Sequence, residues 1–242
     1  MSISTKIKHT CYILTDEKIE HDLLTAAIAC EDYGLWRISG SFSMVGGFCG
    51  GTDGAIIEGV AKPLTAMICY RVYVNYTGVE NVRTVSALAI PLQPLNWARS
   101  VVNHALNRHT NIICMEWVIP TSGPGTETNL LEVAVRSIEA TINGANLYAP
   151  RHSRAQMNAG QTPLEGEFMV EVSDATLAAG IDRERGSEIL AQLAEQLKDK
   201  HPEPGMSIQE CYNLVTHRPM PEFEKAYLKV KEQLASLGLA FN

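Results

Sequence analysis

The sequence predicts a parallel α/β sheet or barrel followed by a helical tail. Two observations support this class. Short runs of β-branched and aromatic residues alternate with stretches of helical period up to about residue 150, and the chain after Pro163 is helical in pattern. With 242 residues, 45% of them hydrophobic and 19% charged, the chain can form one large α/β domain. No repeat or linker divides it, so we treat residues 1–242 as a single unit, with strands and helices in 1–150 and a mostly helical tail in 151–242.

The first elements follow in a helix–strand–helix order. Residues 15–33 begin with Thr15 as a helix-capping residue and carry apolar side chains at helical spacing, which predicts a helix. Residues 35–45 read as a strand, because the apolar side chains fall mostly on one parity. A glycine-rich loop over 46–54 and a helix near 54–64 complete this βα unit.

The middle of the chain repeats the alternation. Residues 68–74 are rich in β-branched and aromatic side chains and predict a strand, with a connection through Thr77 and Gly78 and a less clear stretch at 82–90. A helix is expected over about 95–107, a buried strand over 111–118, and a helix over 128–142 after a Gly/Pro loop.

The last strand pattern is short. Residues 146–149 predict one more strand, and a polar stretch at 151–161 separates it from the helical tail, which has breaks at 180–182, 201–206 and 219–221. The pattern therefore gives three clear strands and one or two weaker ones, whereas eight strands close a (β/α)₈ barrel.

Charge and composition exclude several classes of protein. The net charge of −7 and the absence of a Lys/Arg run argue against a nucleic-acid-binding face. Apolar runs are too short to span a membrane, and the N-terminus lacks a signal-peptide apolar core, so we expect a soluble, cytoplasmic protein with no membrane partner. The six cysteines are scattered without a C-x-x-C pair, which predicts buried reduced thiols and no metal site.

The most informative segment is the glycine loop. Gly46-Gly47-Phe48-Cys49-Gly50-Gly51 holds four glycines in six residues, between a predicted strand and a predicted helix. Glycine permits positive φ or close approach of the backbone to a ligand, and the loop lies where βα units carry function. A tight connection without a ligand is the alternative interpretation.

These motifs resemble a known family. Three segments are similar to archaeal monomethylamine:corrinoid methyltransferases of methanogenesis. They are residues 15–64 with the glycine loop, the run Gly123-Pro124-Gly125-Thr126-Glu127 with the helix after it, and the tail 208–241. The order and approximate spacing agree over nearly the whole chain. The similarity covers only the C-terminal half of the family's length.

The resemblance implies a fold, an activity and partners. It implies half of a (β/α)₈ TIM-type barrel, which a second chain supplying the N-terminal half or a homo-oligomer would complete. Family members transfer a methyl group from a methylamine to the cobalt of a separate corrinoid protein, so no cofactor is expected to be bound directly and the corrinoid is carried by that partner. The family carries pyrrolysine at about the position of Asp53. A carboxylate cannot replace its electrophilic imine, but Asp53 could hold a cationic amine, or it could simply cap the next helix.

The residues at the ends of the predicted strands are the candidate site residues, because barrel active sites lie at the carboxyl ends of the strands. The catalytic candidates are Asp53, Glu127 and Glu116. The position of Glu127 in the family motif further favours a catalytic role for this residue. Glu127 could instead interact with a helix dipole, and Glu116 could face outward from its strand. The candidates for substrate binding are Gly50, Gly51, Thr52, Asn75, Tyr76, Arg151 and Gln156.

Two functions follow from this pattern. The first is a subunit of a corrinoid-dependent methyltransferase, in which Asp53 and Glu127 hold a protonated or quaternary amine. The second is a catalytically degenerate paralogue that serves as a structural or regulatory subunit of a larger assembly. An open acidic pocket would favour the first function, and a barrel mouth filled by aromatic or aliphatic side chains would favour the second.

Overall fold

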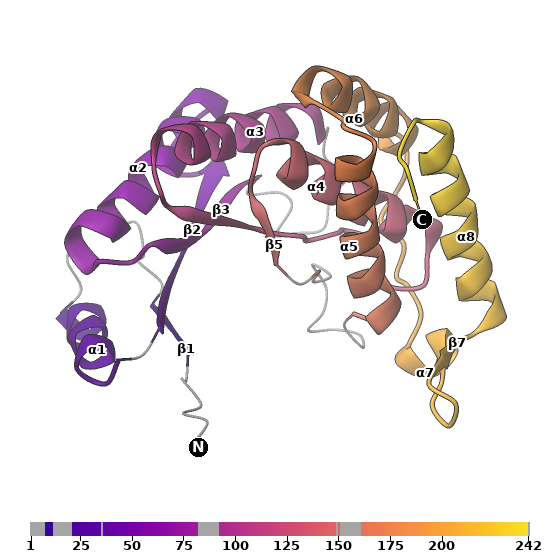
Figure 1. The fold of residues 1–242 in the computed structure, drawn as a ribbon, viewed down its shortest axis with the longest axis horizontal. Coiled ribbons are helices and arrows are strands. Elements are labelled where there is room, and N and C mark those ends of the chain that lie inside the picture. Colours follow the sequence, from indigo (N-terminus) through magenta and orange to yellow (C-terminus); the bar gives the residue numbers. More distant parts are fainter. Residues whose placement is uncertain are drawn as a thin grey trace.

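The computed structural model describes residues 8–11, 21–34, 36–81, 92–148, 150 and 161–241. Figure 1 shows a curved sheet with helices packed along its outer side and a helical bundle at the C-terminal end. The elements in chain order are β1 (Lys8–Cys11), α1 (His21–Asp32), β2 (Trp36–Val45), α2 (Thr52–Tyr70), β3 (Val74–Asn81), α3 (Leu92–His109), β4 (Ile113–Trp117), α4 (Glu127–Ile142), β5 (Asn146–Tyr148), α5 (Pro163–Ala178), α6 (Arg183–Leu197), α7 (Ile208–Cys211), β6 (Tyr212–Asn213), β7 (Arg218–Pro219) and α8 (Pro221–Ser236).

The main sheet has five parallel strands in the order β1-β2-β3-β4-β5. Each strand lies beside the next one in sequence, with a helix in each connection. A doubly wound sheet reverses its strand order at one point, whereas a barrel does not. The sheet is therefore an arc of a TIM-type barrel, and the predicted fold class is confirmed.

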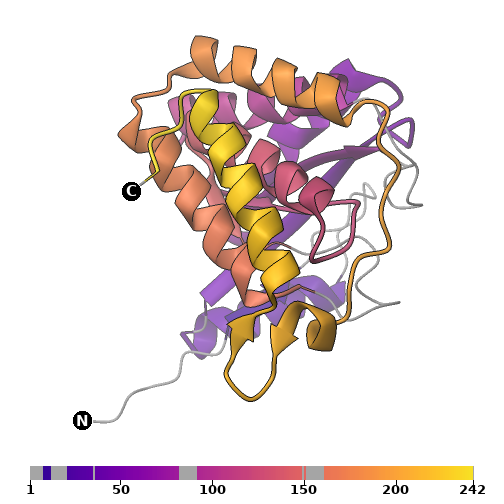
Figure 2. The same cartoon turned by 90° about the vertical axis from the view of Figure 1, so that its right-hand side faces the viewer.

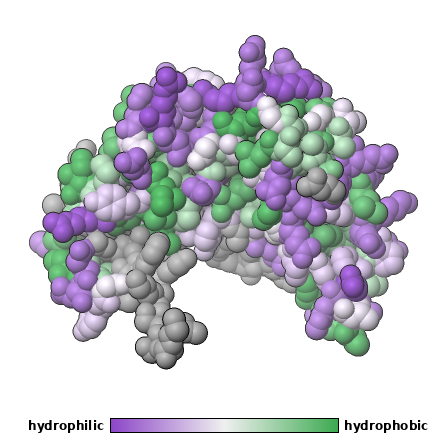
Figure 3. Space-filling model, in the orientation of Figure 1, coloured by the Kyte–Doolittle hydropathy of each residue, from purple (hydrophilic) through white to green (hydrophobic). Residues whose placement is uncertain are grey.

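Each strand has an outer face, packed on the helices, and an inner face on the opposite side. In β3, Thr77 donates a hydrogen bond to Asn103 of α3 and Val79 packs among apolar residues of α2 and α3, so these odd-numbered residues face outward. Successive side chains of a strand alternate between the two faces, so Tyr76 of β3 faces inward. The space-filling view shows the resulting arch, with its hollow side below (Figure 3).

The hydrophobic core has two main parts. One lies between the sheet and helices α2 and α3, and the larger one surrounds α4, which packs against α5, α6 and α8. Figure 2 shows α8 lying across this bundle beside α5. Helix α4 is buried at almost every position from Thr128 to Ala140, because it is covered by the sheet on one side and the bundle on the other.

Two predictions for the middle of the chain are wrong. Residues 68–70 belong to α2 rather than to a strand, and β3 begins only at Val74, so Thr77 and Gly78 lie inside it. The residues of α2 that are buried, among them Pro63, Ala66 and Tyr70, recur at a helical period. That period outweighs the strand propensity of the side chains, and the helix ends at Arg71, which has a left-handed backbone.

Most other boundaries agree with the sequence patterns within a few residues. Strands β2, β4 and β5, helices α3 and α4, and the breaks between tail helices lie where they were expected. The short strand β1 and the antiparallel hairpin of β6 and β7 were not predicted, because segments of two to four residues carry little periodicity. Residues 15–20 and 82–91 lie outside the described residues. None of the described helices combines the length and the apolar character that a membrane span requires.

Candidate functional site

The glycine loop after β2 closes on itself. Gly46 donates its N–H to the carbonyl of Gly50 at 2.7 Å, and Gly47 and Gly50 make further backbone hydrogen bonds at 3.0 Å. Gly46 and Gly50 have φ angles of 80° and 72°, a region in which residues with a side chain are strained. Both glycines are therefore explained by the turn itself.

A side-chain contact fixes this loop to the following helix. The thiol of Cys49 donates a hydrogen bond to the carboxylate of Glu58 on α2, and Glu58 also pairs with Lys62 at 2.6 Å. Burial raises the pKa of Cys49, and the hydrogen bond to Glu58 raises it further. The thiol therefore stays protonated at neutral pH and holds the loop in place rather than acting as a nucleophile.

Asp53 lies in the first turn of α2, next to the loop. The helix begins at Thr52 with Gly51 as its N-cap, and no side chain caps it. The interpretation of Asp53 as the helix cap is therefore wrong. Its exposed carboxylate lies at the positive end of the helix dipole, on the rim formed by the carboxyl ends of the strands.

Asn75 and Tyr76 lie inside β3 rather than after it, which corrects their expected position at a strand end. Asn75 is buried on the outer face, where its amide donates to the carbonyl of Val72 at 3.5 Å. It is therefore not placed to contact a ligand in the barrel. Tyr76 faces inward.

Glu116 is buried and paired, but on the outer face of β4. One carboxylate oxygen lies 3.1 Å from Arg136 of α4 and 3.7 Å from Arg99 of α3, and the other accepts a hydrogen bond from Asn103 at 3.2 Å. Burial raises the pKa of Glu116 to about 8, against the effect of the two guanidinium groups. The expected pairing and pKa shift are present, but the carboxylate points into the helix layer and cannot meet a substrate in the barrel.

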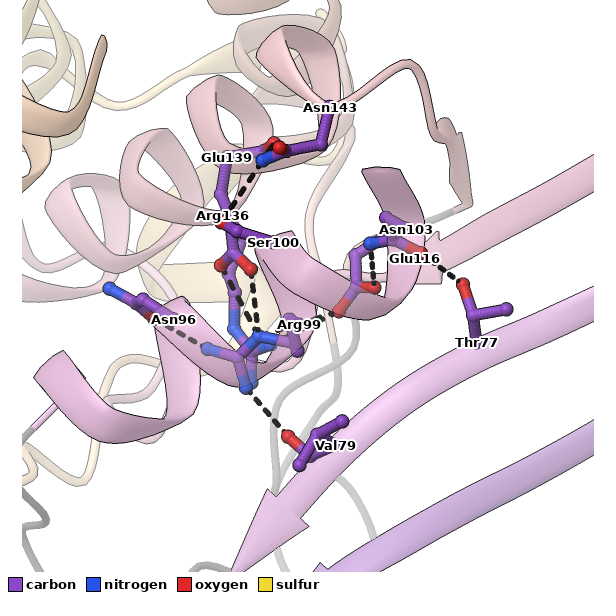
Figure 4. Close-up of polar contacts among 10 residues, drawn as sticks. All are labelled: Thr77, Val79, Asn96, Arg99, Ser100, Asn103, Glu116, Arg136, Glu139 and Asn143. Atoms are coloured by element: carbon purple, nitrogen blue, oxygen red, sulfur yellow. Dashed lines mark hydrogen bonds and ion pairs between the residues drawn. The ribbon is translucent and has the colours of Figure 1, made fainter. Parts of the chain in front are cut away.

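Arg99 extends this contact into a network between the sheet and two helices, drawn in Figure 4. Its guanidinium contacts Glu139 of α4 at 3.2 Å and Asn96 at 2.5 Å, and it donates to the carbonyl of Val79 at 3.0 Å. Strand β3 is paired with β4 only as far as Tyr76, so Arg99 supplies a donor to β3 beyond the paired region. Each buried arginine therefore lies against a buried glutamate, Arg99 against Glu139 and Arg136 against Glu116.

Glu127 is also engaged in a structural contact. It begins α4, and its carboxylate binds Lys229 of α8 at 2.7 Å on the surface of the molecule. Thr126 caps this helix by accepting a hydrogen bond from the N–H of Asn129 at 3.1 Å. Glu127 therefore links α4 to the C-terminal helix, in addition to its position near the helix dipole.

The Gly-Pro loop before α4 is held by the tail of the chain. Gly123 donates to the carbonyl of Glu203 at 2.8 Å, and a side chain at Gly123 would collide with the backbone of Pro204. Gly125, with φ of 81°, donates to the buried carboxylate of Glu165 at 3.2 Å. The glycines of this motif therefore serve close packing between the loop and the tail.

The inner face carries a cluster that the sequence analysis only partly identified. Tyr76 of β3, Trp117 of β4 and Tyr148 of β5 form what we term the aromatic corner. The ring centroids are 5.7 Å apart for Tyr76 and Trp117, 4.8 Å for Tyr76 and Tyr148, and 5.9 Å for Trp117 and Tyr148. Outward-facing Glu116 and Leu147 precede Trp117 and Tyr148, so strand alternation places both aromatic residues inward.

A signal for this cluster was available in the sequence. Trp117 and Tyr148 are the last residues of neighbouring strands, and the strand patterns had been recognised. Arg151 and Gln156, with the polar stretch around them, lie outside the described residues. The described residues contain no cluster of three or more metal-ligating side chains.

Comparison with known proteins assigns the family. The sequence profile described as "Monomethylamine methyltransferase MtmB" matches residues 2–239. The chain belongs to this family. It is 28% identical over 200 residues to monomethylamine methyltransferase MtmB2 of Methanosarcina acetivorans and, to the same extent, to MtmB1 of Methanosarcina barkeri. In both cases the match covers 81% of this chain and 42% of the relative, so the chain spans about half the length of these family members.

The fold agrees with a solved structure. The crystal structure of the monomethylamine methyltransferase MtmB of Methanosarcina barkeri matches 97% of this chain with a TM-score of 0.84 and 24% sequence identity. The match covers 51% of that protein. A second structure, a hydroxylamine complex of MtmB, matches to the same extent.

Proposed function

We propose that this chain is part of a corrinoid-dependent methyltransferase that transfers a methyl group from a methylated amine to a corrinoid protein. The match of the family profile to residues 2–239 carries this proposal. The sequential parallel sheet supports it, because the carboxyl ends of all its strands share one rim.

The barrel needs additional strands to enclose a site. A barrel of this type closes with eight parallel strands, and the main sheet of the described residues holds five, so three further strands would complete it. A second copy would bring five strands rather than three, which favours a different polypeptide segment over self-association. Among the described strands, β1 and β5 each pair on one side only, and these two edges are where the additional strands would join.

The chemistry requires a methylated nitrogen that carries a positive charge. The bond between the methyl carbon and nitrogen breaks with its electron pair left on nitrogen, and the corrinoid cobalt of the partner protein supplies the pair for the new bond. Asp53 is the catalytic candidate that keeps an exposed position on the rim, and we assign it to hold the cationic amine. Glu116 and Glu127 are left out of this role because they are engaged elsewhere.

The test is methyl transfer by the protein purified from its own cells with any subunits that accompany it. Methylated amines are supplied with reduced corrinoid protein, and formation of methylated corrinoid is followed by absorbance. Asp53→Ala should reduce transfer at least about 100-fold while the thermal unfolding midpoint changes little, because the residue is exposed. Glu31→Ala, which removes an exposed carboxylate near the end of α1, is the matched control. Full transfer by the Asp53 variant would exclude this role.

One observation favours the alternative of a structural or regulatory subunit without activity. Two of the three candidate carboxylates are used in contacts between elements of the fold, Glu116 with Arg136 and Glu127 with Lys229. Mass spectrometry of the native assembly separates the alternatives. A second chain that supplies the missing strands, together with methyl transfer, supports the enzyme. A stable assembly that transfers no methyl group from any methylated amine supports the structural role.

A further inference from the structure

The aromatic corner has a geometry suited to a cation. Trp117 and Tyr148 are paired in register at the ends of β4 and β5, and their rings lie nearly perpendicular, at 84°. The distance of 5.9 Å between the ring centroids allows one cation to lie within about 6 Å of both rings, the range of cation–π attraction. Tyr76 contacts both rings.

The aromatic corner also lies at the end of the sheet where barrel enzymes bind their substrates. Active sites of barrels collect at the carboxyl ends of the strands, and Trp117 and Tyr148 are the terminal residues of theirs. Tyr148 is 40% exposed and Trp117 is partly exposed, whereas Tyr76 is only 4% exposed. Trp117 and Tyr148 can therefore contact a ligand, and the buried Tyr76 packs against both of their rings.

We propose that Trp117 and Tyr148 bind the alkylated ammonium group of the methyl donor through the faces of their rings. This inference rests on the proposed function and specifies its substrate class. A quaternary ammonium has no N–H to donate, and its charge is spread over methyl groups that pack well on aromatic surfaces. A primary ammonium is more strongly hydrated and donates hydrogen bonds, so the corner favours quaternary and tertiary donors over primary ones.

Aromatic binding also suits the reaction. The nitrogen must keep its positive charge for the amine to leave, and an aromatic ring stabilises that charge without accepting a proton. On β4 the carboxylate of Glu116 points to the opposite face, so the stabilisation from this strand comes from Trp117 and adds to that from Asp53 at the start of α2.

The test is binding of tetramethylammonium chloride to the full chain, with any accompanying subunits, by ligand-observed NMR titration. Uncharged tert-butyl alcohol of similar shape serves as the ligand control. We expect the cation to bind at least about fivefold more tightly than the alcohol, and both Trp117→Leu and Tyr148→Leu to weaken cation binding by about five- to tenfold. Trp117→Phe keeps an aromatic face and should retain most of the binding even if the leucine variant folds poorly.

The protein variant control is Trp97→Leu, which removes a tryptophan that is 54% exposed on α3 and should leave binding unchanged. Equal binding of the cation and the alcohol, or equal loss in the Trp97 and Trp117 variants, would overturn the inference. Cation binding without methyl transfer would contradict the proposed function alone. Methyl transfer from tetramethylammonium that is unaffected by Trp117→Leu and Tyr148→Leu would contradict this inference alone.

Discussion

The two faces of β4 show how closely structural and functional residues can lie together. Glu116 faces outward into a buried network with arginines from α3 and α4, and its neighbour Trp117 faces inward beside Tyr148. A buried, paired carboxylate with a raised pKa is a common mark of an active site, but here it marks the contact between sheet and helices. The face on which a side chain lies therefore decides its role more reliably than its pKa.

The stability of the packing between the outer face of the sheet and the helices should depend most strongly on Arg99. Its side chain contacts Glu116, Glu139 and the carbonyl of Val79. Arg99→Met leaves two buried carboxylates with less compensating charge, and we expect the free energy of unfolding to fall by about 3–5 kcal/mol. Urea denaturation followed by circular dichroism measures this change. Lys198→Met is the control, since its pair with Glu195 is exposed and contributes less than about 1 kcal/mol.

The same urea denaturation experiment can contradict the structural role of the network on the outer face. If Arg99→Met were as mild as Lys198→Met, the outer network would not stabilise the fold. Its buried charges would then need another explanation, such as a role in a conformational change.

A buried carboxylate away from the sheet should make stability depend on pH. Burial raises the pKa of Glu165 to about 7, against the effect of hydrogen bonds from the N–H groups of Thr162 and Gly125. The protonated form is favoured in the folded state, so its contribution is complete below about pH 4.5 and is lost as pH rises to about 7.

Denaturation at pH 4.5 and at pH 8 tests this dependence. The unsubstituted protein should lose roughly 2–3 kcal/mol more than Glu165→Gln over this interval. Glu222→Gln, which changes an exposed carboxylate on α8, is the control. A Glu165 variant with the same pH dependence as the unsubstituted protein would show that folding does not raise the pKa of this carboxyl group.

Much of the fold followed from periodicity, whereas the site did not. The alternation of strands and helices predicted β2, β4 and α4 within a few residues, because long regular elements repeat their signal. The face on which Glu116 lies could not be predicted, since β4 carries apolar residues on both faces and its sequence does not alternate clearly between apolar and polar side chains. The contact of Glu127 with Lys229 joins residues 102 positions apart, which local patterns do not encode.

The smallest expected effect concerns Glu127, whose position in a family motif suggested a catalytic role. Its carboxylate and Lys229 form an exposed pair at 2.7 Å between α4 and α8. A double-mutant cycle with Glu127→Ala and Lys229→Ala should give a coupling energy of about 0.2–1 kcal/mol, as for other exposed ion pairs. Methyl transfer should be unchanged in both variants, because neither side chain belongs to the inner face. If Glu127→Ala abolished transfer while Lys229→Ala did not, the carboxylate would have a role in the reaction beyond this pair. The conclusion that only residues of the inner face and the rim take part in the reaction would then be wrong for the loop after β4.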